Sequence, residues 1–230
     1  GVAAVILGPR RTRRISVAAV VGALAVPLAA PVAVGDAAEG TLDVVLVQGG
    51  GPRGLHAIDT GSFDTPRRHL QAVGGITGSP DLVLLPENVA NVDGPVAGSS
   101  IDVAFAEVAR RLDTNVVVGV TESEGEGFRN ASVLWGPDGA RLGCYEKQHR
   151  VPFGEYIPLR DLFERLSEDT RFIPRDAIVG EGPAVLDPEG TPRLGIVISY
   201  EVFFASRVAD SVRHGGQLLG DFLLRLLGRH

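Results

Sequence analysis

The chain has 230 residues, enough for one large domain or two small ones, and 44% of them are hydrophobic, as in a globular α/β protein. The formal net charge of −6 argues against a nucleic-acid-binding protein, because binding to phosphates needs a basic face. A single cysteine excludes an internal disulfide framework and a zinc site built from several cysteines. The sequence contains no methionine, so we interpret it as a fragment or a processed piece.

The first apolar stretch, residues 15–34, carries no charge and has about the length that a helix needs to cross a bilayer. Four arginines within residues 10–14 precede it, so the positive-inside tendency puts that flank in the cytoplasm and the rest of the chain outside. The residues leave two interpretations open. One is a secretory signal peptide with small residues near 37–38. The other is the last membrane helix of a polytopic protein, with residues 1–8 ending a preceding helix.

Buried strands and helices alternate along the rest of the chain. Apolar runs predict strands at residues 42–47, 81–87, 115–120 and 193–198, a strand ending in a turn at 185–190, and the beginning of another strand at 215–219. Apolar residues at helical spacing predict helices at 65–76, 100–112 and 202–213, and a short amphipathic stretch at 159–166. The apolar side of the third helix is expected to consist of Phe203, Phe204, Val208 and Val212. This alternation predicts an α/β layered domain.

Charged and polar residues follow three of the expected strands. Glu87 ends the second strand, at the end where open α/β sheets carry their chemistry. An apolar run, a Pro-Asp-Gly turn and a second short run predict a hairpin over residues 131–145 that delivers Lys147 at its end. The strand at 193–198 is followed by Ser199, Tyr200 and Glu201.

Several of these residues also have structural interpretations. Ser199 precedes an apolar helix and is alternatively a helix N-cap. His149 has no Ser-His-Asp spacing around it, so we interpret it as a hydrogen-bonded structural residue. Cys144 is expected to be a small buried core residue, and Asn130 begins a glycosylation sequon that we treat as incidental.

The three segments together resemble the nitrilase (carbon–nitrogen hydrolase) superfamily, in which a Glu, a Lys and a Cys come from three strand ends. The block YEKQHRVPFGEYIP, residues 145–158, is similar to the apolipoprotein N-acyltransferase branch of that superfamily. The resemblance covers roughly residues 42–219 and implies an α-β-β-α layered sandwich. It favours a membrane helix over a signal peptide for residues 15–34. Residues 1–40 then form the membrane segments with a basic loop and linker, 41–219 the nitrilase-like domain, and 220–230 an atypical tail.

The resemblance also implies a reaction and roles for site residues. Glu87 would be the general base, Lys147 would stabilise the oxyanion, and Ser199 would occupy the nucleophile position. Glu155 would orient Lys147, while Tyr200 and Glu201 would flank the nucleophile. An acyl group would pass from a phospholipid to the enzyme and then to the N-terminal amine of a diacylglyceryl-cysteine lipoprotein. No metal or organic cofactor is implied, and the catalytic domain would lie on the outer face of the cell membrane.

Two features depart from the family pattern. The family nucleophile is Cys, whereas this chain has Ser199, whose hydroxyl needs a stronger base than a thiol does. Ser199 is therefore an engineered trap, a natural working nucleophile or a sign of lost activity. The strands that family members carry after the 215–219 segment are not recognised, so we expect a domain that is incomplete at its C-terminus. Alternative functions are an exported amidase or nitrilase-type hydrolase, and a membrane-anchored pseudoenzyme that binds lipid or lipoprotein.

Overall fold

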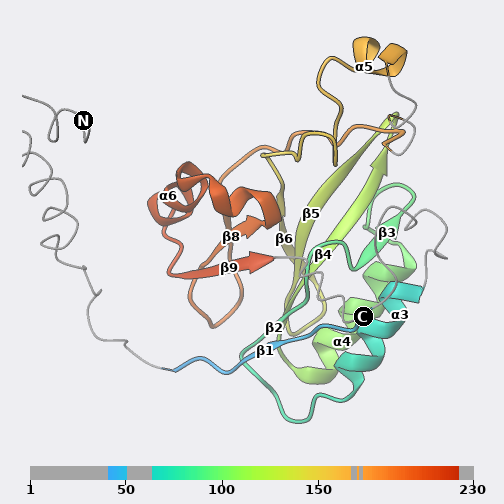
Figure 1. Cartoon of the computed structure of the whole chain (residues 1–230). Coiled ribbons are helices and arrows are strands. Elements are labelled where there is room, and N and C mark those ends of the chain that lie inside the picture. The colour runs from blue at the N-terminus through green and yellow to red at the C-terminus, as the bar shows by residue number, and fades with distance from the viewer. Residues whose placement is uncertain (1–40, 51–63, 167–169, 171–172, 223–230) are drawn as a thin grey trace, which may run out of the picture. The chain divides into compact units, whose positions relative to one another are not determined.

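A computed structural model of the protein describes residues 41–50, 64–166, 170 and 173–222 (Figure 1). The expected membrane segment at 15–34 and the end of the expected tail lie outside these ranges. Within them, the helices are all too short or too polar to span a bilayer. Residues from Leu42 onward form one compact unit, which contains all the secondary structure described below.

Two sheets form the centre of this unit. In the described residues the larger sheet has six strands in the order β1-β2-β4-β5-β6, with β3 paired to the far end of β4. Its strands are β1 (Val44–Leu46), β2 (Leu82–Leu84), β3 (Ala90–Val92), β4 (Asn115–Glu124), β5 (Gly127–Trp135) and β6 (Arg141–Glu146). β1, β2 and β4 are parallel, whereas β4, β5 and β6 form an antiparallel meander. The meander contains the predicted hairpin that ends at Lys147.

The smaller sheet has the order β7-β8-β9. Its strands are β7 (Val185–Leu186), β8 (Leu194–Ile198) and β9 (Leu218–Phe222). β8 is antiparallel to β7 and parallel to β9. The strand that we expected to begin at 215–219 therefore exists and continues to Phe222, three residues into the segment assigned to the tail.

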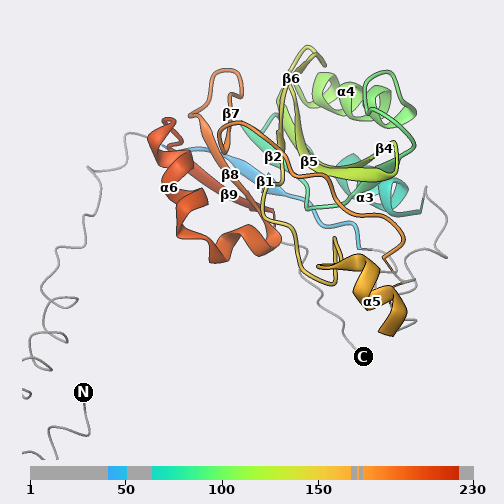
Figure 2. The same ribbon diagram turned by 90° about the horizontal axis from the view of Figure 1, so that it is seen from above.

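Side chains alternate between two cores because successive residues of a strand point to opposite faces of the sheet. Val116, Val118 and Val120 of β4 face the helices α3 (Asp64–Gly74) and α4 (Ser100–Leu112). Val117, between them, faces the smaller sheet, where it joins residues of β8 such as Ile196. Helix α6 (Ala205–Arg213) packs on β8 from the other side. Figure 2 shows the resulting α-β-β-α layers, which confirm the expected fold class.

The helix expected at residues 100–112 has the predicted bounds. Ser99 caps its N-terminus by accepting a hydrogen bond from the Asp102 backbone N–H, and Asp113 ends it in a left-handed conformation with φ of 49°. The third expected helix, 202–213, is confirmed from Ala205 onward and wrong in its first three residues. A 3₁₀ turn, η3 (Ser199–Phe203), is followed by Phe204 in an extended conformation, and α6 begins only at Ala205.

This break changes which residues α6 buries. Phe203 is 79% exposed and Val212 is 64% exposed, so the predicted apolar side of the helix is wrong. The buried positions are Arg207 and Ser211. A side chain on Gly195 of β8 would lie 2.7 Å from Ser211 Oγ, which shows how closely α6 approaches the sheet.

Cys144 does not lie in the core, which corrects the sequence prediction. It is exposed on β6, which is the last strand at its edge of the larger sheet as described. Alternation along β6 turns its neighbour Tyr145 into the space between the two sheets, where Tyr145 is 1% exposed, and leaves Cys144 on the opposite face.

Candidate active site

The three predicted site segments leave the sheets at strand ends. Glu87 follows β2 and Pro86, and the segment is fixed against β4 because the Gly119 N–H donates to the Pro86 carbonyl at 3.1 Å. A Cβ on Gly119 would lie 2.5 Å from the Cα of Glu87, so only glycine fits at this point of β4. Lys147 follows β6, and its N–H donates to the Asn130 carbonyl of β5 at 2.8 Å.

Lys147 is held between two carboxylates. Its ammonium Nζ lies 3.0 Å from Glu87 Oε1 and 2.7 Å from Glu155 Oε1, and its side chain is 2% exposed. Burial by itself lowers the pKa of Lys147, but the negative charges of Glu87 and Glu155 outweigh it, and the pKa lies above its ordinary value. Lys147 is therefore a fixed, buried cation at neutral pH.

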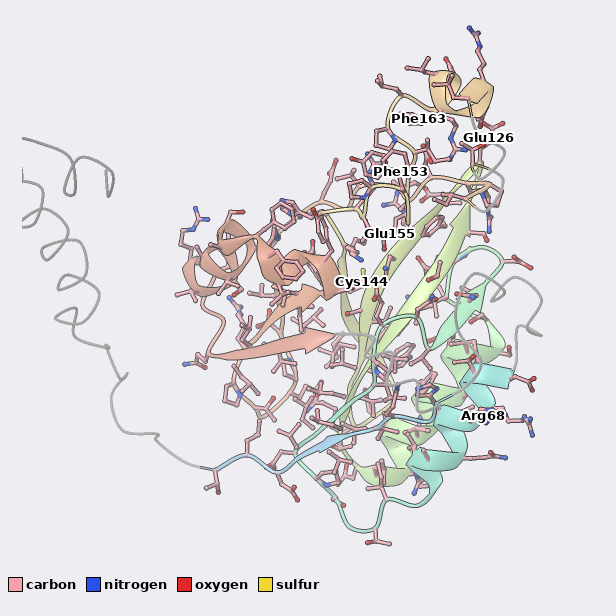
Figure 3. The ribbon with its side chains drawn as sticks, viewed as in Figure 1. Arg68, Glu126, Cys144, Phe153, Glu155 and Phe163 are labelled. Carbon is pink, nitrogen blue, oxygen red and sulfur yellow. The ribbon has the colours of Figure 1, made fainter. Side chains whose placement is uncertain are left out.

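Glu155 is positioned by its own loop. Its Oε2 accepts a hydrogen bond from the Val151 N–H at 2.8 Å, and its carbonyl accepts one from the Ala177 N–H at 2.6 Å. The turn between Val151 and Glu155 passes through Phe153, which has a φ of 56°. Figure 3 shows Glu155 and Phe153 on this loop, beside the ends of the long strands.

Asn130 belongs to the same cluster, although the sequence analysis assigned it no role. Its Nδ2 donates to Glu87 Oε1 at 2.6 Å and to Glu155 Oε1 at 3.1 Å, so it bridges the two carboxylates opposite Lys147. It is 6% exposed. The sequence offered one signal for Asn130, a polar residue immediately before the apolar run of β5. A sequence pattern alone does not relate Asn130 to Glu87, which lies 43 positions earlier.

Ser199 begins the turn after β8 with a φ of 53°, an uncommon conformation for a residue with a side chain. Sharp strand-to-helix turns of this kind present nucleophiles in other hydrolases. The N-cap interpretation of Ser199 is wrong, because Ile198 caps η3 and Phe204 caps α6.

Glu201 ties the Ser199 turn to the Lys147 strand end. It is fully buried and accepts hydrogen bonds from the Tyr145 hydroxyl at 2.9 Å and from the backbone N–H groups of Gln148, His149 and Ile198 at 2.8, 3.1 and 3.0 Å. Burial and the Glu201 charge raise the pKa of Tyr145, so its hydroxyl remains a donor. The residues that follow Lys147 and those that flank Ser199 thus share one buried carboxylate.

His149 and Tyr200 surround this turn. The His149 ring stacks on Phe204 with a centroid distance of 3.9 Å, and its Nδ1 lies 3.8 Å from Glu201 Oε1. The Nδ1 atom is buried without a hydrogen-bond partner among the described residues, so stacking on Phe204, and not the expected ring hydrogen bond, is what the structure shows for His149. The Tyr200 ring meets the edge of Phe204 at 5.1 Å. Among the described residues there is no cluster of side chains suited to hold a metal ion.

Comparison with known proteins adds to this geometry. The family described as Carbon-nitrogen hydrolase matches residues 81–221. The chain belongs to this family. Its fold is similar to a carbon–nitrogen hydrolase from Helicobacter pylori, with a TM-score of 0.55 and 15% identity over 79% of this chain and 59% of that protein. It is also similar to Nit3 of Saccharomyces cerevisiae, with a TM-score of 0.54 and 16% identity over 79% and 64% of the two chains.

Curated relatives of this carbon–nitrogen hydrolase are named apolipoprotein N-acyltransferase. One from Mycolicibacterium smegmatis is 29% identical over 194 residues, which cover 76% of this chain and 32% of the relative. One from Geobacter metallireducens is 35% identical over 149 residues, which cover 62% of this chain and 27% of the relative. The chain therefore spans about a third or less of the length of these relatives.

Proposed function

We propose that this chain is the nitrilase-like part of an apolipoprotein N-acyltransferase. The observation that carries the proposal is the buried Lys147 ammonium, which lies within 3.0 Å of both Glu87 and Glu155, on a strand end that shares Glu201 with the Ser199 turn. This combination puts a base and a cation in contact, and Glu201 links the strand end that carries the cation to the turn that carries the nucleophile position. The names of the curated relatives support the choice of acyl transfer over amide hydrolysis.

In the first half-reaction, the Ser199 Oγ would attack the carbonyl carbon of a phospholipid acyl ester. Glu87 would take the hydroxyl proton, and Lys147 would stabilise the oxyanion that forms. When the tetrahedral intermediate collapses, the bond to the glycerol oxygen breaks and that oxygen takes the proton from Glu87. The products would be a lysophospholipid and an acyl ester on Ser199.

In the second half-reaction, the N-terminal amine of a diacylglyceryl-cysteine lipoprotein would attack the acyl ester. Glu87 would take a proton from the amine and return it to the Ser199 Oγ as the ester bond breaks. The product would be an amide on the lipoprotein, and the free hydroxyl would be regenerated. An ester on Ser199 is less reactive toward an amine than a thioester, so this step should be slow for the serine form.

The surroundings proposed for this reaction follow from the sequence. We assign residues 1–40 to membrane segments and a linker, and residues 41–222, which include the whole of β9, to the catalytic domain. The arginines before the apolar segment favour a catalytic domain on the extracytoplasmic face of the cell membrane, where the phospholipid donor and the lipoprotein acceptor would both be reached.

Intact-mass measurement after incubation with phospholipid tests this proposal. The full-length chain, Ser199→Ala and Ser199→Cys are compared. We expect the mass of one acyl chain to be added to the serine and cysteine forms and not to Ser199→Ala. An adduct on Ser199→Cys alone would mean that the scaffold is competent and the serine form has lost activity. The absence of an adduct on all forms would reject acyl transfer and leave the binding-only alternative or a hydrolase with another substrate.

A further inference from the structure

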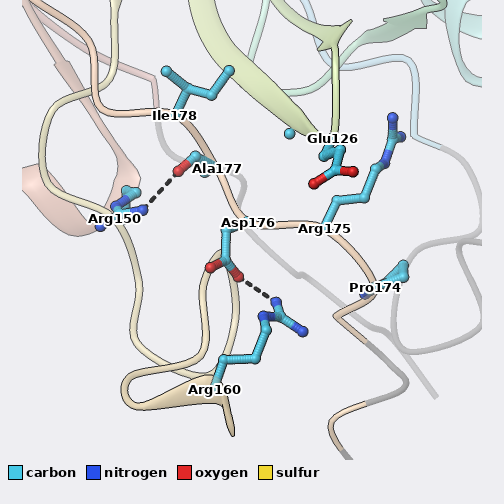
Figure 4. A pocket seen from close by; sticks show the side chains of 9 residues that line it. Glu126, Arg150, Arg160, Pro174, Arg175, Asp176, Ala177 and Ile178 are labelled. Carbon is cyan, nitrogen blue, oxygen red and sulfur yellow. Dashed lines mark hydrogen bonds and ion pairs between the residues drawn. The ribbon is translucent and has the colours of Figure 1, made fainter.

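A pocket of about 800 Å³ opens beside the candidate site (Figure 4). Three arginines line it: Arg150 from the loop after Lys147, Arg160 from the start of α5 (Arg160–Leu166), and Arg175 from the segment after that helix. Two carboxylates, Glu126 and Asp176, line the same space. Arginines from three different segments thus line one cavity, whose volume is in the range of small-molecule sites.

Two of the three guanidinium groups are available for an anion. Arg160 is paired with Asp176 and with Glu164. Arg150 donates to the Ala177 carbonyl at 2.8 Å, and Arg175 donates to Ser123 Oγ at 3.0 Å. Both of these acceptors are neutral, and in the described part of the chain neither Arg150 nor Arg175 is paired with a carboxylate. Each retains N–H donors in the fork geometry that matches a phosphate.

The pocket is attached to the candidate site through its wall. Ala177, which lines the pocket, donates its N–H to the Glu155 carbonyl at 2.6 Å. Arg150 lies over the ring of Tyr156, next to Glu155, at 4.3 Å. A ligand bound by Arg150 would therefore contact the same loop that positions Glu155.

An exposed apolar tip lies on the same segments. Phe153, Leu159, Leu162 and Leu166 are 56%, 73%, 50% and 71% exposed, and α5 buries none of its residues. Figure 3 shows Phe153 and Phe163 at this tip, where their rings meet edge to face at 5.2 Å. Large apolar side chains near arginines that have no carboxylate partner are typical of surfaces that lie at a lipid interface, with the apolar groups toward acyl chains and the cations toward phosphates.

We propose that this pocket binds the phosphate group of a phospholipid, with Arg150 and Arg175 as its ligands and the apolar tip against the acyl chains. The phosphate chemistry rests on the arginines alone. The choice of a lipid over free phosphate rests on the apolar tip and on the proposed function, in which a phospholipid is the acyl donor.

Calorimetric titration of the full-length Ser199→Ala chain tests the proposal without turnover. The probes are short-chain dihexanoyl-phosphatidylglycerol below its micelle concentration, dihexanoylglycerol, which lacks the phosphate, and inorganic phosphate. Arg150→Gln combined with Arg175→Gln is compared with Arg68→Gln combined with Arg213→Gln. The control pair removes the same charge from exposed positions on α3 and α6.

We expect the Arg150→Gln and Arg175→Gln pair to weaken phosphatidylglycerol binding at least about tenfold, because each replaced group makes charge-assisted hydrogen bonds. The control pair should change it less than about twofold. Equal weakening by both pairs, or dihexanoylglycerol binding as tightly as phosphatidylglycerol, would overturn the phosphate site. Inorganic phosphate binding as tightly as the lipid would overturn the lipid assignment. Because no acyl transfer occurs, the result is independent of whether the proposed reaction takes place.

Discussion

At the scale of single residues, Asn130 is the least expected member of the candidate site. It and Lys147 each donate to Oε1 of Glu87 and Oε1 of Glu155, so the two donors and two carboxylates form a closed ring. The two carboxylates repel each other because both lie against the same ammonium. The Asn130 amide is a second donor, and it reduces this repulsion without adding charge. The amide therefore helps to hold Glu87 where a base is required.

Replacing Asn130 with Ala should slow acyl-adduct formation about 10-fold to 100-fold, because hydrogen bonds to charged groups contribute about 1.5–3 kcal/mol. The measurement is the single-turnover rate of adduct formation, monitored by intact mass. The parent protein is the serine form or Ser199→Cys, whichever forms the adduct. Asn91→Ala, at an exposed position on β3, is the matched control and should keep the parental rate. A parental rate for Asn130→Ala as well would show that Asn130 has no part in positioning Glu87.

At the scale of elements, β4 and the segment after β2 depend on a close backbone approach. Gly119 accepts a hydrogen bond from the Val89 N–H at 2.8 Å and donates one to Pro86 at 3.1 Å, on either side of Glu87. This arrangement explains why Glu87 leaves the sheet at that point. The apolar run 115–120 predicted the strand, but nothing in the run identified its glycine as the contact with Glu87.

Gly119→Ala should reduce stability by about 1–3 kcal/mol and also reduce the rate of acyl transfer, because the added methyl group overpacks the contact and displaces Glu87. Urea unfolding and adduct formation measure the two effects. Gly143→Ala on β6 is the control, because its added Cβ would meet its nearest neighbour, Leu186, at an ordinary 3.7 Å. Unchanged unfolding and turnover of Gly119→Ala would contradict the role of this approach.

The elements themselves were largely predictable, for reasons that differ between helices. The helix at 100–112 was predicted with its bounds because apolar spacing, the Ser99 cap and the Asp113 stop all act locally. The helix at 202–213 was predicted with its correct end, but its start and its apolar side were wrong because burial of Glu201 and Arg207 outweighs the apolar pattern and leaves Phe203 in solvent. The prediction that Cys144 is buried was wrong because a strand's place at a sheet edge depends on its pairing and not on its composition.

At the scale of the molecule, the candidate site depends on contacts between the two sheets. The sequence indicated Glu87, Lys147 and Glu155, which the structure brings together, because each follows a strand or lies in a distinctive block. It could not predict that Glu201 would accept hydrogen bonds from residues more than 50 positions away. That carboxylate joins β6 of the larger sheet to the turn after β8 of the smaller one, so its partners hold the sandwich together as well as the site.

This arrangement predicts how stability depends on pH. The pKa of Tyr145 is raised from 10.0 by burial and by the Glu201 charge, and the pKa of Lys147 is raised from 10.5. In both cases the folded state holds its proton more tightly than the unfolded chain does. The stabilisation is therefore fully present below about pH 10 and is lost as the pH rises above it, by about 1.4 kcal/mol per pH unit for each group.

Urea unfolding between pH 7 and 11 should show this loss, and Tyr145→Phe should change it in two ways. Below pH 9 the variant should be less stable than the parent by about 1–3 kcal/mol, because Glu201 loses a donor, while the pH slopes of the two proteins agree. Above pH 10 the variant should lose stability less steeply, because the Lys147 contribution remains and that of Tyr145 is gone. Parallel curves over the whole range would mean that Tyr145 ionises equally easily in both states, whereas coinciding curves below pH 9 would mean that its contact with Glu201 does not stabilise the fold.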